Sequence, residues 1–322
     1  MTLIRTVLGD IEPATLGVTY AHEHLVIDGG RPVLMEPGFD LGDVTAMATE
    51  VAEAIALGLG AVVDAMPCDA GRSALKLADL SRRTGIHIVA PTGLHHDRYY
   101  GPVHWSTRLR IEEIATLFVM DITDGIDQYD YNGPVVERTE HRAGVIKVAG
   151  SDGGPSDRDR RIFEAAALAH LATGAPILTH CEAGTGGLEQ LRLLTDLGVQ
   201  PRAVAFSHVD KVVDRGYHRE LLGSGAFGEY DQSFRWRDAN GTIQLIEWAA
   251  DDGLDGQILL GMDAARRDYY HVYDGAPGLA WLLDGFTAAL TQAGIDETVR
   301  HRLFVDNPAR AFAFAAVEGG VA

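Results

Sequence analysis

The stretch VTYAHEHLVID, residues 18–28, sets two histidines one residue apart at the end of an apolar run typical of a β-strand. Because successive side chains of a strand point to opposite faces, His22 and His24 point to the same side. Two imidazoles on one strand face can bind one metal ion without rearrangement of the chain, although such pairs also arise by chance. The pair therefore raises the question of which fold surrounds this strand.

Seven further segments are built in the same way, as short runs rich in Val, Ile and Ala with ionisable residues last. The eight candidate strands cover residues 18–27, 60–67, 86–95, 143–151, 175–182, 203–210, 225–231 and 256–263. Segments of helical periodicity, such as 41–60 and 157–174, alternate with them. This alternation predicts an α/β protein made of βα units.

Eight such units predict a (β/α)8 TIM barrel. Residues 1–17 remain and are expected to form a short N-terminal β-hairpin, with residues 18–322 forming the barrel. A doubly wound open sheet would need a Gly-rich turn after its first strand, and residues 21–26, AHEHLV, contain none. Without a repeat or a long linker in the sequence, residues 1–322 are expected to be a single domain.

Composition restricts the partners and the location. The chain has 27 Lys and Arg against 46 Asp and Glu, a formal charge of −19, which disfavours nucleic acid and anionic membranes. The first twenty residues lack a basic start and a long apolar stretch, and Cys68 and Cys181 are too few for a disulfide framework. We expect a soluble cytoplasmic protein that takes a small-molecule substrate and forms a homodimer.

The carboxyl ends of the strands form the active face of a TIM barrel. The ionisable residues there are His22, His24, Asp64, His95, His96, Lys147, His180, His208, Asp231 and Asp263. One histidine at a strand end is more often a hydrogen-bonded structural residue than a ligand. Four histidines, a lysine and an aspartate on five strands of one barrel converge, however, and together they favour a metal site. Their nitrogen and oxygen donors suit zinc or a similar divalent ion.

Lys147 is unusual because the segment VIKVA, residues 145–149, places an amine inside an apolar strand. A buried, unpaired ammonium costs roughly several kcal/mol or loses its proton, unless the side chain extends to solvent. A neutral amine can react with carbon dioxide to form a carbamate. The two oxygens of a carbamate can bridge two cations about 3.5–4 Å apart.

These motifs resemble those of the phosphotriesterase family in the amidohydrolase superfamily, over nearly the whole chain. The matching segments are AHEHL (21–25), GVIKVAG (144–150), THCEAGTGG (179–187), FSHVDK (206–211), GMD (261–263) and NPAR (307–310). The resemblance implies that His22, His24 and Asp263 hold a more buried metal ion. It also implies that His180 and His208 hold a more exposed one.

The resemblance further implies a mechanism. Carboxylated Lys147 would bridge both ions together with a hydroxide that attacks a carbonyl or phosphoryl centre, and Asp263 would accept and relay the proton. The expected catalytic residues are therefore Lys147 and Asp263. The expected cofactors are two divalent ions per chain, with zinc favoured over manganese or cobalt, and the carbon dioxide that carboxylates Lys147.

The loops after strands three and eight, residues 93–105 and 264–279, are expected to bind the substrate. Their candidate residues are His95, Arg98, Tyr99, Tyr100, Arg266, Arg267, Tyr269 and Tyr270. Arginine forks and tyrosine hydroxyls suit a phosphate or carboxylate. The alternative is surface salt bridging, with Asp97 and Asp268 as partners.

These loops resemble most the subgroup of the family that hydrolyses sugar lactones, including phosphorylated furanose lactones. Members acting on apolar acyl lactones or organophosphates tend to carry Tyr or Trp where this chain has His95. The segment 231–241 offers Arg235 and Arg237 but no lysine. We expect a lactonase for polar or phosphorylated sugar lactones. The alternatives are an arylesterase or phosphotriesterase and, in another class, a non-catalytic metal-binding barrel.

Overall fold

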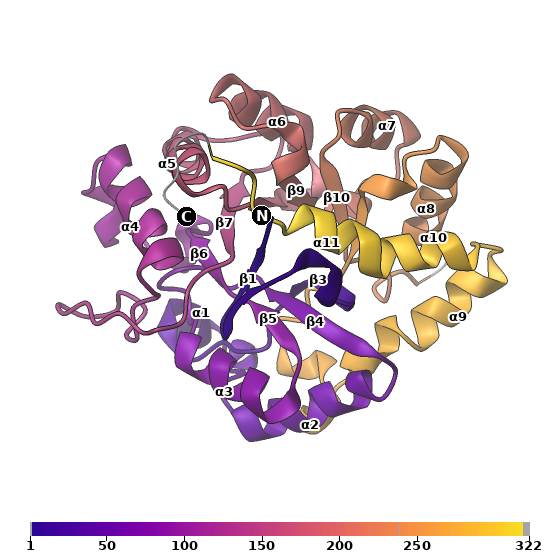
Figure 1. The fold of residues 1–322 in the computed structure, drawn as a ribbon, viewed down its shortest axis with the longest axis horizontal. Helices are drawn as coiled ribbons and strands as arrows, with labels where there is room; N and C mark the ends of the chain where they lie inside the picture. Colours follow the sequence, from indigo (N-terminus) through magenta and orange to yellow (C-terminus); the bar gives the residue numbers. More distant parts are fainter. Residues whose placement is uncertain (1, 238, 318–322) are drawn as a thin grey trace.

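The computed structural model describes residues 2–237 and 239–317, and it confirms the predicted barrel (Figure 1). Eight barrel strands, which we call staves, follow one another in chain order, and the third is divided into two short strands. They are β3 (Val18–Glu23), β4 (Leu59–Asp64), β5 (His87–Val89) with β6 (Pro91–Gly93), β7 (Val145–Gly150), β8 (Ile177–Cys181), β9 (Val204–Ser207), β10 (Phe227–Tyr230) and β11 (Ile258–Leu260). Wherever neighbouring staves are joined by a ladder of backbone hydrogen bonds, the two strands are parallel.

The barrel closes where its last stave meets its first. The backbone N–H of Asp263 donates to the carbonyl of His22 at 3.0 Å, and that of Met262 donates to the Glu23 carboxylate at 2.7 Å. A Cβ at Gly261 would lie 2.8 Å from the His22 carbonyl oxygen, so only glycine allows this approach. Glu23, the residue between the two histidines, thus joins the first strand to the last.

The helices lie outside the staves (Figure 1). They are α1 (Gly30–Met35), α2 (Val44–Ile55), α3 (Ala74–Thr84), α4 (Ile111–Thr123), α5 (Asp157–Thr173), α6 (Gly187–Asp196), α7 (Arg215–Gly223), α8 (Gly241–Asp251), α9 (Gly285–Gln292), α10 (Glu297–His301) and α11 (Asn307–Ala311). Side-chain caps fix several starts: Ser73, Ser156 and Asn240 each accept from a backbone N–H of the first turn. In the described residues, none of these helices has the length and apolarity needed to cross a membrane.

The amino-terminal end of the barrel is covered. Strands β1 (Ile4–Thr6) and β2 (Gly9–Ile11) pair antiparallel within the segment expected to be a hairpin, and β1 lies across the barrel together with α11 (Figure 1). Ile4 and Phe312 belong to the same apolar cluster as the strand residues Val63 and Leu178. The opposite, carboxyl-terminal end is the one left for a site.

All eight strands are shorter than the expected ranges, and two of them differ in a way that affects the site. The third strand, expected over residues 86–95, is interrupted at Ala90, because Pro91 has no N–H for a continuous ladder. The last strand ends at Leu260, and Asp263 follows it in a left-handed conformation with φ of 48°. Several predicted site residues therefore lie just beyond their strands.

Candidate active site

The structure brings the six predicted metal ligands together at the carboxyl end of the barrel. Five of them, His22, His24, His180, His208 and Asp263, line one cavity of about 260 Å³. The sixth, Lys147, is buried beside them, and its Nζ donates to Ser207 Oγ at 3.3 Å. Ser207 Oγ also lies 3.0 Å from His22 Nδ1, which places the amine against the histidine cluster. We call this space the catalytic cavity.

One half of the cluster is formed by the first and last strands. His24 Nε2 lies 3.1 Å from Asp263 Oδ1, and His22 Nε2 lies 3.6 Å from the same oxygen. Two imidazole nitrogens and one carboxylate oxygen thus converge within the reach of a single divalent ion. This donor set fits the more buried metal ion that the motifs predict.

For His22, His208 and His180, the partner of one ring nitrogen shows which nitrogen is left to face the cavity. His22 Nδ1 contacts Ser207 Oγ and Glu229 Oε2, the latter at 3.2 Å, and this leaves Nε2 for an ion. His208 Nδ1 lies 2.5 Å from Asp231 Oδ2, which also leaves Nε2. Such partners fix the tautomer and the ring orientation of a metal-binding histidine.

His180 has the opposite orientation. Its Nε2 lies 2.9 Å from Glu182 Oε2, so Nδ1 is the nitrogen left for an ion shared with His208, whose ring centroid is 4.3 Å away. Glu182 Oε2 also lies 3.1 Å from His96 Nε2 and 3.3 Å from Arg98 Nη2. Glu182 therefore connects a predicted metal ligand with the loop after β6.

The electrostatics of the cluster favour metal-binding protonation states. Burial, reinforced by Lys147, lowers the pKa of His22, and burial with His208 lowers that of His180, so both rings are neutral near pH 7. Burial also lowers the pKa of Lys147 to about 8, although Glu229 and Asp263 oppose the shift. A lysine with this pKa is partly neutral under mildly alkaline conditions, as carbamate formation requires.

Asp263 is held from both sides of its peptide. Arg235 donates to the carbonyls of Asp263 and Met262 at 2.9 and 2.7 Å, while the N–H of Ala264 donates to Glu23 at 3.2 Å. Burial acts to raise the pKa of Asp263, but His24 and His208 outweigh it and keep the pKa below its usual value. The side chain is therefore an ionised carboxylate.

The loop residues divide into two groups. His95, Arg98, Tyr99, Arg266 and Tyr269 line the catalytic cavity, as the sequence predicts. The other three, Tyr100, Arg267 and Tyr270, do not belong to its lining.

Each of these three side chains is occupied elsewhere. The hydroxyl of Tyr270 donates to the His24 carbonyl at 2.9 Å, and that of Tyr100 donates to the Cys68 carbonyl at 3.0 Å. The Arg267 guanidinium binds Asp40 through its carbonyl and carboxylate, at 2.6 and 2.9 Å. These contacts hold the loops in place, and a role in substrate binding for the three residues has no geometric support.

Salt bridging also involves other partners than expected. Within residues 2–237 and 239–317, Arg98 pairs with Glu182, and Arg266 pairs with Glu36, so neither arginine uses Asp97 or Asp268. Sequence proximity suggested Asp97 and Asp268, but the partners Glu182 and Glu36 lie on other segments of the chain.

Sequence reasoning missed two groups of residues. Lys211 lines the catalytic cavity, and Glu182, Ser207 and Glu229 support the histidines. Arg235, which the sequence offered in the segment 231–241, lines the cavity as well. Ser207 and Lys211 flank His208 in FSHVDK, while Glu182 follows His180 by two residues. The nearby motifs were therefore the signal that could have identified them.

Residues 2–312 match the model of the Phosphotriesterase family. The chain belongs to the phosphotriesterase family. It is 34% identical over 323 residues to a phospho-furanose lactonase of Mycoplasmopsis synoviae (strain 53), covering 96% of this chain and 91% of that protein.

Two solved structures also match this chain over almost its whole length. An amidohydrolase from Mycoplasma synoviae superposes with a TM-score of 0.93 at 32% identity, over 98% of this chain and 93% of that one. A lactonase from Listeria monocytogenes superposes with a TM-score of 0.88 at 29% identity, over 98% and 100%. Membership of the family therefore rests on the whole barrel as well as on the motifs.

Proposed function

We propose that this family member, a metal-dependent hydrolase acting on ester bonds, is a lactonase for phosphorylated sugar lactones. The observation that carries the proposal is the charge of the catalytic cavity. In a chain of net charge −19, the lining of this cavity has more cationic side chains, Arg98, Lys211, Arg235 and Arg266, than carboxylates, Glu182 and Asp263. Such a rim suits an anionic substrate, and the name of the relative from Mycoplasmopsis synoviae agrees with it.

The proposed metal centre uses the six predicted ligands. His22, His24 and Asp263 would hold one ion, His180 and His208 the other, and Lys147, carboxylated by carbon dioxide, would bridge them. We infer zinc from the nitrogen-rich donor set, with manganese or cobalt as alternatives. When bound, the two ions supply a Lewis acid for the carbonyl oxygen and an activated water as nucleophile.

The chain itself performs the proton transfers. The ionised Asp263 accepts the proton of the attacking water and returns it to the ring oxygen when the lactone opens. Arg235 Nη2 lies 3.8 Å from Asp263 Oδ2, so its charge favours the ionised carboxylate between turnovers. Since Arg235 and Glu23 hold the backbone around Asp263, the carboxylate keeps its position while its charge changes.

The rim positions the substrate. Arg266 and Tyr269 lie on the loop after β11, while Arg98 and Tyr99 lie on the loop after β6, all in the lining of the same cavity. We propose that Arg266, Tyr269 and Lys211 bind the phosphate of the substrate. His95 and Tyr99 would then contact the hydroxyls of the sugar ring.

Further parts of the proposal rest on the sequence. The −19 charge supports the absence of nucleic acid and membrane partners, and the two buried, unpaired cysteines support a cytoplasmic location. We also propose one domain over residues 1–322 and a homodimer in solution.

A substrate screen tests the function. Protein loaded with zinc or manganese is assayed with a pentono-1,4-lactone 5-phosphate, the unphosphorylated lactone, an aryl ester and a phosphotriester. We expect the highest kcat/KM for the phosphorylated lactone. A higher value for the phosphotriester would assign the protein to organophosphate hydrolysis instead, and no turnover of any ester by metal-loaded protein would indicate a binding function.

A further inference from the structure

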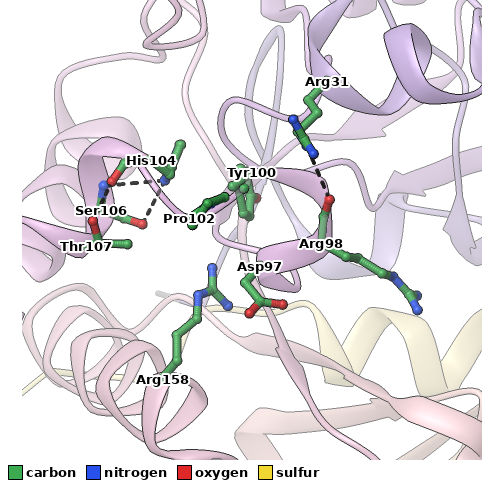
Figure 2. A pocket seen from close by; sticks show the side chains of 10 residues that line it. Arg31, Asp97, Arg98, Tyr100, Pro102, His104, Ser106, Thr107 and Arg158 are labelled. Atoms are coloured by element: carbon green, nitrogen blue, oxygen red, sulfur yellow. Dashed lines mark hydrogen bonds between the residues drawn. The ribbon is translucent and has the colours of Figure 1, made fainter.

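A second cavity, of about 360 Å³, lies next to the catalytic cavity, because Arg98 lines both. Its walls come from α1, through Arg31, from residues 97–107 after β6, and from the first turn of α5, through Arg158 (Figure 2). The volume falls within the roughly 300–1,000 Å³ typical of small-molecule sites. We call it the loop cavity.

Arg158 has an unused donor in the loop cavity. Its Nη1 donates to the His95 carbonyl at 3.0 Å, but Nη2 is buried and has no hydrogen-bond partner within the described residues. A buried donor without a partner is unfavourable, and more so when it carries charge. The Arg158 guanidinium therefore favours an acceptor that enters the cavity.

Arg31 provides a second guanidinium. It enters from the side opposite Arg158 in Figure 2, and its Nε makes a long contact of 3.5 Å with the Arg98 carbonyl. Two guanidinium groups facing one space bind a phosphate well, because their forked N–H groups match its oxygens.

The loop cavity also contains an acceptor. Asp97 lines the cavity together with Arg158 (Figure 2), and within residues 2–237 and 239–317 its carboxylate forms no ion pair within 4.0 Å. A carboxylate repels a free dianion but accepts hydrogen bonds from hydroxyl groups. The part of the wall that contains His104 is held in place, because His104 contacts Ser106 Oγ at 2.7 Å and Asp69 at 2.9 Å.

We propose that the loop cavity binds a sugar phosphate, with the phosphate between Arg31 and Arg158 and the sugar hydroxyls at Asp97. This site is separate from the proposed lactonase site and does not depend on it. Arg158 also donates to the carbonyl of His95, and His95 lines the catalytic cavity. A sugar phosphate bound by Arg158 is therefore connected to the catalytic cavity through His95.

Calorimetric titration of the full chain with ribose 5-phosphate and, separately, with inorganic phosphate tests the proposal. Arg31→Gln is the main variant, since Arg31 is exposed and we expect its replacement to leave the fold intact. We expect Arg31→Gln and Arg158→Gln each to raise the Kd of one ribose 5-phosphate binding event about tenfold. The controls Arg266→Gln, in the catalytic cavity, and Arg192→Gln, on the surface of α6, should leave that event unchanged.

Comparison of ribose 5-phosphate with inorganic phosphate shows whether the site recognises the sugar as well as the phosphate. We expect ribose 5-phosphate to bind more tightly than inorganic phosphate, and Asp97→Asn to reduce this difference. Equal affinity for the two ligands would refute the sugar part of the proposal. Unchanged Kd values in both Arg31→Gln and Arg158→Gln would refute the site itself, whatever the outcome at Arg266.

Discussion

The strand ends and the rim loops both bring charged side chains to the catalytic cavity, but they hold them differently. At the strand ends, His22 is 1% exposed and Asp263 is tied to it through a backbone hydrogen bond of 3.0 Å. On the rim, Arg98 and Arg266 are partly exposed and are held by ion pairs with Glu182 and Glu36. The fold thus fixes the side chains at the strand ends, whereas the side chains of the rim depend on pairs that can change without altering the barrel.

The largest effect is expected at Lys147. Lys147→Ala removes the proposed bridge, so activity should fall on the order of a thousandfold or more. Elemental analysis should find close to two divalent ions per chain in the wild type and fewer than one in the variant. Short carboxylic acids with bicarbonate should restore part of both.

Lys76→Ala is the matched control. Lys76 pairs with Asp28 and the Gly42 carbonyl on the outside of the barrel, so its loss should change neither metal content nor activity. Retention of both metals in Lys147→Ala would show that the carbamate bridge does not exist.

The rim is tested by two neighbouring arginines. Arg266→Ala should lower kcat/KM on a phosphorylated lactone about ten- to hundredfold, since a charge-assisted contact contributes about 1.5–3 kcal/mol. Arg267→Ala should have less than about a twofold effect, because Arg267 binds Asp40 outside the cavity lining. On the unphosphorylated lactone the two variants should be alike. Equal losses with both lactones would contradict phosphate binding by Arg266.

Glu182 joins the two regions and should have an intermediate effect. Glu182→Gln weakens the contact that orients His180, so affinity for the more exposed metal ion should fall about tenfold. Competition with a chelator measures this affinity. Glu189→Gln, which alters an exposed pair with Arg192 on α6, is the control and should behave as wild type. Unchanged metal affinity in Glu182→Gln would show that Glu182 does not orient His180 and only holds the rim residue Arg98.

The pKa of Lys147 predicts a smaller, pH-dependent effect. Carbamate formation needs the neutral amine, whose fraction increases as the pH rises through about 8. At a fixed concentration of dissolved carbon dioxide, activation of metal-free protein by zinc should therefore be about fivefold faster at pH 8 than at pH 7. A rate that is independent of pH between these values would show that deprotonation of Lys147 is not limiting.

Two neighbouring tyrosines give the smallest effect. Tyr270→Phe leaves the buried His24 carbonyl without its donor and should lower the free energy of unfolding by about 1–2 kcal/mol. Tyr269→Phe should instead raise KM with little change in stability, since Tyr269 lines the catalytic cavity. Urea denaturation and steady-state kinetics of both variants separate the two roles. The reverse pattern would place Tyr270 at the substrate.

The same contrast explains what the sequence could predict. The barrel and the convergence of His22, His24, Lys147, His180 and Asp263 follow from strand periodicity, because parallel strands end at one face whatever their loops do. The orientation of Tyr270 and Arg267 could not be predicted, since a loop side chain points where neighbouring loops offer a partner. Their partners, the His24 carbonyl and Asp40, lie more than two hundred residues away in the chain.

Glu23 has a consequence for how the protein is made. It binds the backbone on both sides of Asp263, and the residues it joins are separated by 239 positions at Met262. A ribosome-bound chain whose eighth strand has not yet emerged therefore contains His22 and His24 but lacks Asp263. It also lacks the backbone N–H groups of Met262 and Ala264 that Glu23 binds. The six proposed ligands therefore come together only after the N- and C-terminal parts of the barrel meet.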